Sequence, residues 1–509
     1  MAFPWQDLQV DIKLEILSRL PAKSLLRFKC VCKSWLSLFS DPSFIHKHLL
    51  HRNSAACGDD DETLLIHGNA RGHYNVSLVK LKNPSSHTTF NLNHQFPEKN
   101  NMCDMDLIGS INGLVCLASG PQTEGSTLIL WNPTTQQYTN IPTPMIKFPK
   151  PGGNFTIGFC FDSLRNDYKI LRLVWSLSGQ TRPPPRAEVY SVSADCWREI
   201  EVEIPFDFVY SRCDTIVRGE PYWAAHFYSS KKSSSFYNVV WFDACEEVFR
   251  QGPPLALGLP HTLVNGLANF KNSVAVLVTE MFPPETEHEW KTSLWVMEEE
   301  SSSWTMKFRA GFPWLYWLFM MSLRRSSDCL ISQTPSPAGV VEGGQDPMPL
   351  ATIATAAKHR RPKGSLLDPR RPMGTPLLTS WNIGAGIQHL VIFESMISLL
   401  VMEDESSTWS TKFSAGFSGY LSLVGFSKNG EMVFLANDVQ RMEHVLRLYN
   451  PKTKETINIQ IDLKGLRANT VRFRVNDYTA SLVPVKKSKQ AEKEGTTCGS
   501  HSYISAQQR

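Results

Sequence analysis

A unit of about 50 residues recurs along most of this chain and constrains its fold more than any other feature. Each unit has a β-type run that ends in an apolar or aromatic residue, then a polar turn, then a second run with an apolar anchor. The residue before the turn lies at positions 82, 131, 190, 242, 296, 401 and 449, so successive spacings are 49, 59, 52, 54, 105 and 48. A period near this length with hairpins inside it indicates the blades of a β-propeller.

A second hairpin precedes several of these units. Asn-Gly between alternating apolar residues is a strong hairpin signal, because both central positions tolerate a positive φ. It occurs in "SINGLVCLA" (Ser110–Ala118), "TLVNGLANF" (Thr262–Phe270) and "FSKNGEMVFLA" (Phe426–Ala436). Two hairpins per period make a four-stranded blade, and we expect the late run Tyr478–Pro484 to pair with Thr63–Gly68 and close the ring. The chain is therefore expected to be α+β and multidomain, with an all-β propeller-like domain of about six blades behind a small helical region.

The spacing of 105 residues interrupts the pattern. Ser293–Phe312 and Ser398–Phe417 align without gaps and are identical at 14 of 20 positions, which indicates a local duplication. Arg324–Gly374, between the copies, is rich in Pro, Gly and Arg and is expected to be disordered or inserted sequence. Our preferred hypothesis is that one copy forms the outer hairpin of the fourth blade and the other is extruded or packs imperfectly. A rival hypothesis joins Ile383–Phe393 to the second copy as a seventh blade. A third possibility is that the sequence joins exons that a functional product does not combine.

The N-terminal region is short and unusually apolar. Eighteen of the 32 residues from Leu8 to Phe39 are apolar. Ile12, Ile16, Leu17 and Leu20 recur at helical spacing, and Pro21 ends that predicted helix.

A second helix is expected over Lys23–Cys32, with apolar residues around nearly its whole circumference, and a third is expected to end near Asp41-Pro42. A module of about 40 residues rarely buries enough surface to be stable alone. An apolar face of the module should therefore cover either the remaining chain, as a helical cap, or another protein.

The segment "EILSRLPAKSLLRFKCVCKSW" (Glu15–Trp35) resembles an F-box, especially the plant form. In that family the three-helix module docks onto the small SKP adaptor of a cullin–RING ubiquitin ligase. The resemblance implies an adaptor-facing surface made by Leu8, Ile12, Ile16, Leu17, Leu20, Pro21, Leu25 and Leu26. It implies that the three helices are held together by Phe28, Val31, Cys32 and Trp35.

The β-rich part resembles the plant F-box-associated domain. "GFCFDSLRNDYKILRLV", "AEVYSVSADCWREI", "VVWFDACEEVF" and "LRLYNPKTKETINI" occur in that family's order, whereas the paired glycines of the neighbouring kelch repeat are missing. We therefore divide the chain into an F-box (5–50), a first propeller part (63–312), an insert with partial duplication (313–397), a last propeller part (398–484) and a disordered tail (485–509).

The sequence contains no catalytic motif that supports an enzyme, and we expect no catalytic residue, cofactor or metal. His46, His48 and His51 are interpreted as part of a solvated linker, and Cys103 and Cys160 as core thiols. A net charge of +4 without a stripe of Arg and aromatic residues argues against nucleic-acid binding. The most apolar run, Gly311–Leu323, has 13 residues and is too short to cross a membrane, which needs about 20. The eleven scattered cysteines and the polar start favour a cytoplasmic or nuclear location.

These features lead to one main functional hypothesis and two alternatives. The chain is expected to be a non-catalytic subunit of an SKP–cullin–F-box ubiquitin ligase that binds the SKP adaptor, and through it cullin and RING subunits, and presents an unknown target protein. Candidate target-binding loops are Ser176–Arg186 and Tyr228–Ser235. The alternatives are a propeller-type enzyme or sugar-binding protein with a helical cap, and a damaged relative without a working target-binding domain.

Overall fold

The structure is a computed structural model of the chain. It describes residues 8–53, 62–70, 73–81, 87–96, 105–119, 127–147, 153–176, 184–203, 207–208, 213–228, 235–253, 255, 262–280, 289–298, 303–313, 377–382, 387–392, 394–402, 409–418, 420–438, 443–450, 453, 455–459 and 472–485. The predicted insert Arg324–Gly374, most of the apolar run Gly311–Leu323 and all but the first residue of the predicted tail lie outside these residues.

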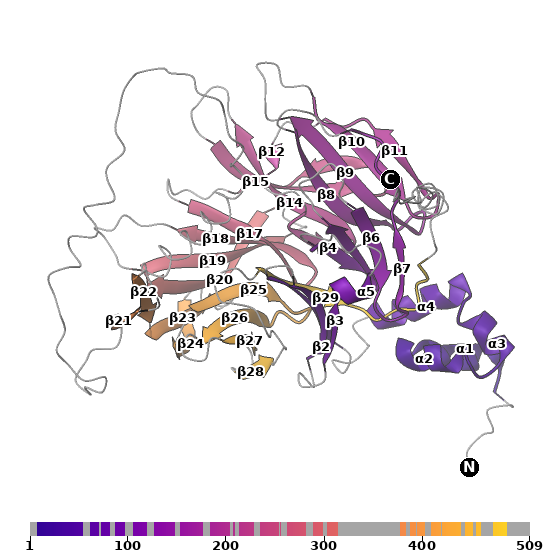
Figure 1. Cartoon of the computed structure of the whole chain (residues 1–509), viewed down its shortest axis with the longest axis horizontal. Helices are drawn as coiled ribbons and strands as arrows, with labels where there is room; N and C mark the ends of the chain where they lie inside the picture. The colour runs from indigo at the N-terminus through magenta and orange to yellow at the C-terminus, as the bar shows by residue number, and fades with distance from the viewer. Residues whose placement is uncertain are drawn as a thin grey trace, which may run out of the picture.

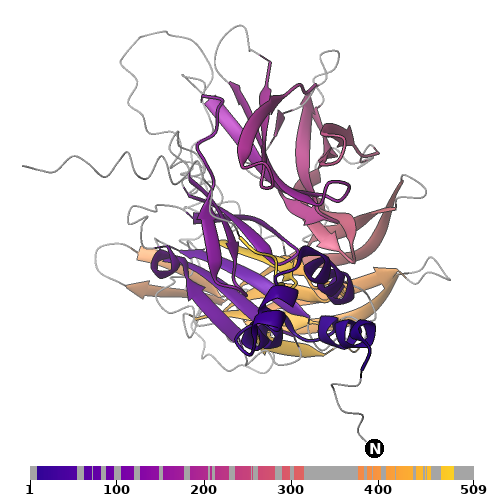
Figure 2. The ribbon, with the colours of Figure 1, turned by 90° about the vertical axis from the view of Figure 1, so that its right-hand side faces the viewer.

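Four helices form the N-terminal region: α1 (Val10–Ser18), α2 (Ala22–Phe28), α3 (Lys33–Leu38) and α4 (Pro42–Asn53). Figures 1 and 2 show them together at one side of the strand-rich domain. The sequence predicted the first three but not α4, because Asp41-Pro42 was interpreted as a turn. Asp41 instead caps α4: its Oδ1 accepts hydrogen bonds from the backbone N–H groups of Ser43 (2.9 Å) and Phe44 (3.2 Å). Pro42 then occupies the first helical position, which needs no backbone donor.

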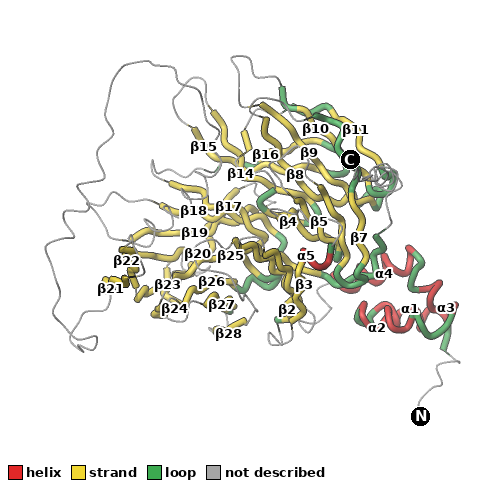
Figure 3. Tube along the Cα trace, viewed as in Figure 1, coloured by secondary structure: helices red, strands yellow, loops and turns green. Residues whose placement is uncertain are grey.

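Most of the other described residues are strands, as Figure 3 shows in yellow. They form six antiparallel blades and a separate pair, β21 (Leu377–Asn382) with β22 (Ile387–Ile392). Blade one contains β29 (Arg472–Tyr478), β1 (Thr63–Ala70), β2 (His73–Lys80) and β3 (His87–Asn91), and the short helix α5 (Leu92–Gln95) follows β3. Blade two contains β4 (Met105–Ile111), β5 (Leu114–Ser119), β6 (Thr127–Asn132) and β7 (Gln137–Asn140). Blade three contains β8 (Gly153–Asp162), β9 (Asp167–Ser176), β10 (Arg186–Ser191) and β11 (Cys196–Ile200). Blade four contains β12 (Asp207–Phe208), β13 (Thr215–Val217), β14 (Glu220–Tyr228), β15 (Ser235–Asp243) and β16 (Val248–Gln251). Blade five contains β17 (Thr262–Phe270), β18 (Ser273–Glu280), β19 (Glu289–Glu298), β20 (Ser303–Pro313), β23 (Glu394–Met402) and β24 (Trp409–Ser418). Blade six contains β25 (Tyr420–Phe426), β26 (Met432–Asp438), β27 (Glu443–Tyr449) and β28 (Thr456–Ile459).

The six blades close into a ring, which confirms the expected propeller. Strands near the centre contact one another in a circle: β29 contacts β4, β4 contacts β8, β8 contacts β14, β14 contacts β17, β17 contacts β25, and β25 contacts β29. Closure joins the two ends of the chain, because β29 pairs with β1 from Tyr478↔Thr63 to Arg472↔Asn69. The sequence predicted β1 correctly but placed its partner in Tyr478–Pro484, one strand length too late.

The recurring sequence unit has a local physical cause in the turn after its anchor. The residue after the anchor caps the turn: Asn132 Oδ1 accepts from the backbone of Thr134 (2.9 Å), and Asp243 Oδ1 accepts from that of Cys245 (3.0 Å). Four residues after each cap the chain takes a positive φ, at Gln136 (59°) and Glu247 (60°). The acceptor is the side-chain oxygen of an Asn or an Asp a few residues from its donors. The turn is therefore specified by a short segment, and the blade repeat can be recognised from the sequence.

The duplicated segments both lie in the fifth blade, not the fourth. The first copy forms the hairpin β19–β20, and the second forms β23–β24, which pairs with the outer edge of β20 from Phe308↔Val401 to Gly311↔Ser398. Both hairpins have their register shift at the equivalent place, after Leu294 and after Leu399. The second copy therefore extends the blade to six strands, and both the extrusion hypothesis and the seventh-blade hypothesis are wrong for the described residues.

Removing one copy should leave the propeller intact. Deletion of Phe308–Lys412 joins Lys307 to Phe413 within the identical Lys-Phe step of the two hairpins and restores the common spacing of about 50 residues. We expect cooperative thermal unfolding within a few degrees of the full chain, since the inner strands are untouched. Loss of a cooperative transition in calorimetry would contradict this expectation and make the second hairpin essential for the fold.

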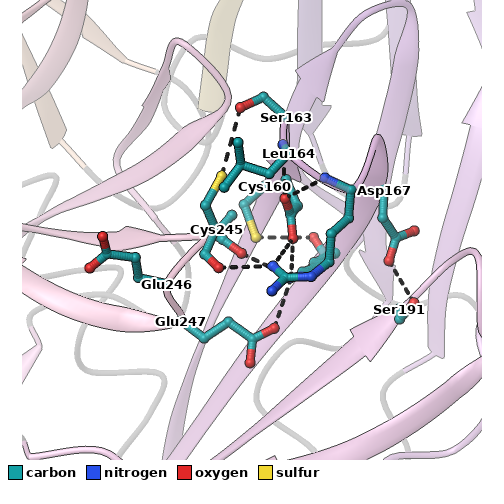
Figure 4. Close-up of polar contacts among 12 residues, drawn as sticks. Cys160, Ser163, Leu164, Asp167, Ser191, Cys245, Glu246 and Glu247 are labelled. Atoms are coloured by element: carbon teal, nitrogen blue, oxygen red, sulfur yellow. Dashed lines mark hydrogen bonds and ion pairs between the residues drawn. The ribbon is translucent and has the colours of Figure 1, made fainter.

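A buried lysine joins the third and fourth blades. Lys169 Nζ on β9 donates to Asp162 Oδ2 (2.6 Å), to Glu247 Oε1 (2.8 Å) and to the carbonyl of Ala244 (2.9 Å). Figure 4 shows the surrounding polar contacts, including the Cys245 and Glu247 turn of the fourth blade. Burial alone would raise the pKa of Asp162, but the hydrogen bonds from Lys169 and Arg165 outweigh it and lower that pKa. The ion pairs therefore hold two blade turns together at one end of the propeller.

Candidate functional site

The helix α1 has apolar residues on two opposite sides. Leu14 and Leu17 pack against the core cluster that includes the helical module, and Leu17 is buried. Ile12 and Ile16 lie on the other side, one turn apart, with exposed fractions of 46% and 41%. Intramolecular packing therefore accounts for one apolar side of α1 and leaves the other uncovered.

Two polar contacts fix α1 against α4. Glu15 forms ion pairs with Lys47 (2.9 Å) and with Arg19 (2.7 Å), which lower its pKa to about 2. His48 is fully buried and its Nε2 lies 3.0 Å from the carbonyl oxygen of Leu20, just beyond the end of α1. The interpretation of His48 as part of a solvated linker is therefore wrong, and burial lowers the pKa of its imidazole.

Aromatic rings link the remaining helices. Phe28 lies 5.2 Å from Trp35, Trp35 lies 5.8 Å from Phe39, and Phe39 lies 5.3 Å from Phe44, measured between ring centroids. These separations are typical of favourable aromatic pairs. The row runs from the end of α2 through α3 to α4, so the helix missed by the sequence analysis completes the core of the module.

The structure separates the predicted adaptor-facing residues into two groups. Leu17 and Leu25 are buried, with Leu25 at 0% exposure, and they stabilise the module from inside. The others are exposed or half-buried: Leu8, Ile12, Ile16, Leu20, Pro21 and Leu26.

The predicted core residues also divide. Phe28 and Trp35 pack against the core, whereas Val31 is 66% exposed and Cys32 is exposed. The reason is that α2 ends at Phe28, four residues earlier than expected, so Cys30, Val31 and Cys32 lie between helices and not on a helix buried on all sides.

Most exposed large apolar side chains of the described residues gather on this module. Six of the ten lie between residues 10 and 50. We call this set the exposed apolar surface: Val10, Ile12, Ile16, Val31, Leu36 and Leu50. Its members Val10, Leu36 and Leu50 were missed by the sequence analysis, which assigned surface positions only by resemblance. A concentration of this kind marks an interaction surface more often than chance exposure does.

The last residue of α4 attaches the module to the propeller. Asn53 Nδ2 donates to Asn112 Oδ1 in the first turn of the second blade (3.1 Å), and its carbonyl accepts from Lys428 Nζ in the first turn of the sixth (3.4 Å). Thr479, just after the closing strand, donates to Asn53 Oδ1 (3.2 Å). At the neighbouring Gly113 (φ +82°) an added Cβ would lie 2.4 Å from Ser481 Oγ, so only glycine fits beside this junction.

The module carries the chain's excess of positive charge. Residues 8–53 contain eight Lys and Arg and three Asp and Glu, a net charge of +5, against +4 for the whole chain. Exposed apolar side chains among basic residues suit a protein partner with an apolar groove and an acidic rim.

Other kinds of site find little support in the described part of the chain. No three or more His, Cys, Asp or Glu side chains are grouped there so that they could hold a metal ion. No described helix is both long enough and apolar enough to span a membrane. The loops proposed from sequence for target binding have their central residues, 177–183 and 229–234, outside the described residues.

Family comparisons match both parts of the chain. A model described as the F-box domain matches residues 5–47, and one described as the F-box associated beta propeller domain matches residues 70–335. An F-box/kelch-repeat protein of Arabidopsis thaliana is 32% identical over 254 residues, which cover 48% of this chain and 60% of that relative. F-box protein CPR1 of Arabidopsis thaliana is 26% identical over 327 residues, covering 60% of this chain and 73% of CPR1.

Two limits apply to these likenesses. The chain spans three fifths of the length of the first relative, so the activity of that whole protein does not transfer directly. Among solved structures, a prolyl endopeptidase matches with a TM-score of 0.34 and 8% identity, covering 88% of this chain and 56% of the other. A likeness of that size supports no conclusion about activity.

Proposed function

Because the chain belongs to the family of proteins that carry an F-box associated β-propeller domain, we propose that it is a substrate adaptor of an SKP–cullin–F-box ubiquitin ligase. The helical module binds the SKP adaptor and through it the cullin and RING subunits, and the propeller binds a target protein. The chain itself is non-catalytic in this proposal: it brings a target lysine close to a ubiquitin thioester held by another subunit. The domain boundaries given above are kept as part of the proposal.

One observation carries the proposal: the apolar surface left uncovered on the helical module. If the module were only a cap on the propeller, its apolar side chains would be covered by the chain itself. Instead α4 and Asn53 make the contact with the propeller, and Ile12 and Ile16 on the far side of α1 stay exposed. Each apolar side chain of this size contributes about 1.5–3 kcal/mol when it is fully buried.

The orientation of the propeller supports a target site away from the module. Antiparallel strands alternate in direction, so the turns between first and second and between third and fourth strands lie at one end of a blade, and the other connections at the opposite end. The module contacts Asn112 and Lys428, in the first type of turn, where connections are as short as Asn112–Gly113. The strand ends that flank the two candidate target loops, Ser176 and Arg186 in one blade and Tyr228 and Ser235 in the next, belong to the opposite end.

The experiment that tests the proposal is direct binding of the purified full chain to a plant SKP adaptor, measured by calorimetry. Ile12→Asp/Ile16→Asp should weaken binding at least tenfold, because two carboxylates would have to be buried against the partner. Both positions are exposed in the free chain, so the thermal midpoint should change little. The buried Leu25 is unsuited to this test, since an aspartate there would unfold the module itself.

The matched control places the same charges on the propeller. Val248 and Ile457 are each 41% exposed, the same fraction as Ile16, and Val248→Asp/Ile457→Asp should bind the adaptor as the parent does. Equal affinity of both double variants, or no adaptor binding by the parent chain, would refute the proposal.

A further inference from the structure

Two exposed thiols lie together on the helical module. Cys30 and Cys32 fall between α2 and α3, and among the seven described cysteines they are the exposed ones. Val31, between them, is 66% exposed and belongs to the exposed apolar surface. Cys116, Cys160 and Cys213 are buried, so the folded chain contains both accessible and protected thiols.

The surroundings of Cys32 favour its thiolate form. Its Sγ lies 3.1 Å from Ser34 Oγ, and it directly precedes the first residue of α3. The hydrogen bond with Ser34 is the main cause that lowers the pKa of the Cys32 thiol. Lys33 follows it directly and Lys29 lies three residues before it, so an anion here is also favoured by charge.

The buried cysteines are in the opposite condition. Burial raises the pKa of Cys116 and that of Cys160 well above the ordinary value for a thiol. The thiolate is the reactive form and access is needed for attack, so both requirements separate Cys32 from the core thiols. The difference in exposure and thiol pKa within one chain indicates that the surface pair is the more reactive one.

We propose that Cys32, with Cys30 as its partner thiol, is a site of thiol–disulfide exchange with a small disulfide such as oxidised glutathione. The Cys32 thiolate attacks one sulfur of the disulfide, a mixed disulfide forms, and the departing glutathione thiolate takes a proton from water. Cys30 then attacks Cys32 Sγ and releases a second glutathione, so the two electrons lost by the protein thiols end on the two glutathione thiols. Two residues of chain span at most about 7 Å between Cα atoms, which is within the reach of a disulfide.

The exchange would act on the proposed adaptor surface, and this consequence rests on the proposed function. Until Cys30 displaces it, the glutathione on Cys32 adds a bulky anionic group beside Val31 and lowers the local excess of positive charge from Lys29 and Lys33. Both changes oppose docking of an acidic partner with an apolar groove. Oxidising conditions would therefore weaken adaptor binding, and a thiol reductant would restore it.

The test follows each thiol of the full folded chain during incubation with oxidised glutathione, by mass spectrometry of its peptides. Among the seven described cysteines we expect Cys32 to react first, at least about fivefold faster than the half-buried Cys196 and Cys245, with Cys116, Cys160 and Cys213 unmodified until the chain is denatured. Ser34→Ala should slow the reaction at Cys32 about threefold and leave the thermal midpoint unchanged, a result that a purely structural serine would not give. Reaction of Cys32 no faster than Cys196, or insensitivity to Ser34→Ala, would overturn the proposal.

A second readout separates this inference from the proposed function. Adaptor binding is measured for the reduced chain, the glutathione-treated chain and a treated Cys30→Ser/Cys32→Ser variant. Loss of binding only in the treated parent supports regulation, and unchanged binding despite stoichiometric modification overturns it. If the reduced parent does not bind at all, the adaptor role fails, while the site-resolved rates still decide whether the exchange site exists.

Discussion

Lys169→Met is expected to destabilise the propeller by about 3–5 kcal/mol, because it removes one partner from a buried ion-pair group. Methionine keeps the length and apolar part of the side chain, so the change isolates the amine. Without Lys169 Nζ, the fully buried carboxylate of Asp162 keeps only Arg165 as an ionic partner, and Glu247 keeps only the more exposed Arg198 of the third blade. Chemical denaturation of parent and variant at pH 7 measures the difference in free energy of unfolding.

The control is an ion pair of similar geometry at the surface. Arg186 donates to both oxygens of Glu199 at 2.7 Å, but their side chains are 57% and 44% exposed. Arg186→Met should therefore cost less than about 1 kcal/mol. Equal effects of the two substitutions would show that the Lys169 group does not stabilise the blades. Asp162→Asn added to Lys169→Met should recover part of the loss, since it removes the stranded charge.

The pH dependence of the Lys169→Met effect follows from Asp162. In the parent its pKa is held below the ordinary value of 3.8, so its pairing stabilises the chain above that pH and the contribution disappears as pH falls further. The variant has already lost most of this contribution. The difference in free energy of unfolding between the variant and the parent should therefore become smaller below about pH 4.

Asp477→Asn is expected to stabilise the chain at neutral and alkaline pH, by an amount on the order of 4 kcal/mol at most. Asp477 is on the closing strand, and its Oδ1 is buried with no hydrogen-bond partner among the described residues. Burial, and next the charge of Glu62, raise its pKa from 3.8 to about 7, and Lys428 only partly opposes this. Asparagine keeps the shape without the charge.

The sign follows from proton linkage. The folded chain holds the Asp477 proton more tightly than the unfolded chain, so parent stability falls as pH rises from about 4 to about 7 and the loss is complete above that. The difference in thermal midpoint between Asp477→Asn and the parent should therefore increase over the same pH range.

Asp243 supplies the opposite control. Burial opposes its ionisation, but hydrogen bonds from the backbone of Glu246 and from Arg250 lower its pKa, so Asp243→Asn should destabilise the chain at pH 7. A pH-independent effect of Asp477→Asn would contradict the prediction.

The blade repeat was predictable because its cause is local. Asn132, Asp243 and their equivalents cap turns whose donors lie two or three residues away, so turn and strand ends are encoded within one short segment. The closing strand was misplaced for the opposite reason. Arg474 and Asp477 break the apolar pattern of β29, and Arg474 donates to the carbonyls of Leu107 (3.0 Å) and Cys213 (3.1 Å), which are far from it in the sequence.

The helical module shows the same division. Apolar spacing identified the residues of α1 and α2, but the family resemblance placed Leu17 and Leu25 on the adaptor-facing surface and Val31 and Cys32 in the core, whereas Leu17 and Leu25 are buried and Val31 and Cys32 are exposed. Those assignments depend on α4, which supplies Phe44, Ile45 and His48 to the interior. The signal for α4 was present in Asp41-Pro42 followed by Phe44, Ile45, His48 and Leu49 at helical spacing.

The sequence by itself determined that the chain contains a repeated β architecture and a small helical region with more apolar surface than it can bury. Periodicity, turn caps and composition report such properties because each acts over a few residues. Only the tertiary structure decided which apolar side chains remain uncovered, where the ring closes and at which end of the propeller the helices attach. The exposure of Ile12 and the burial of Leu25 depend on how the four helices pack, and the contacts of Asn53 with Lys428 and Thr479 join chain segments hundreds of residues apart. No local pattern encodes either.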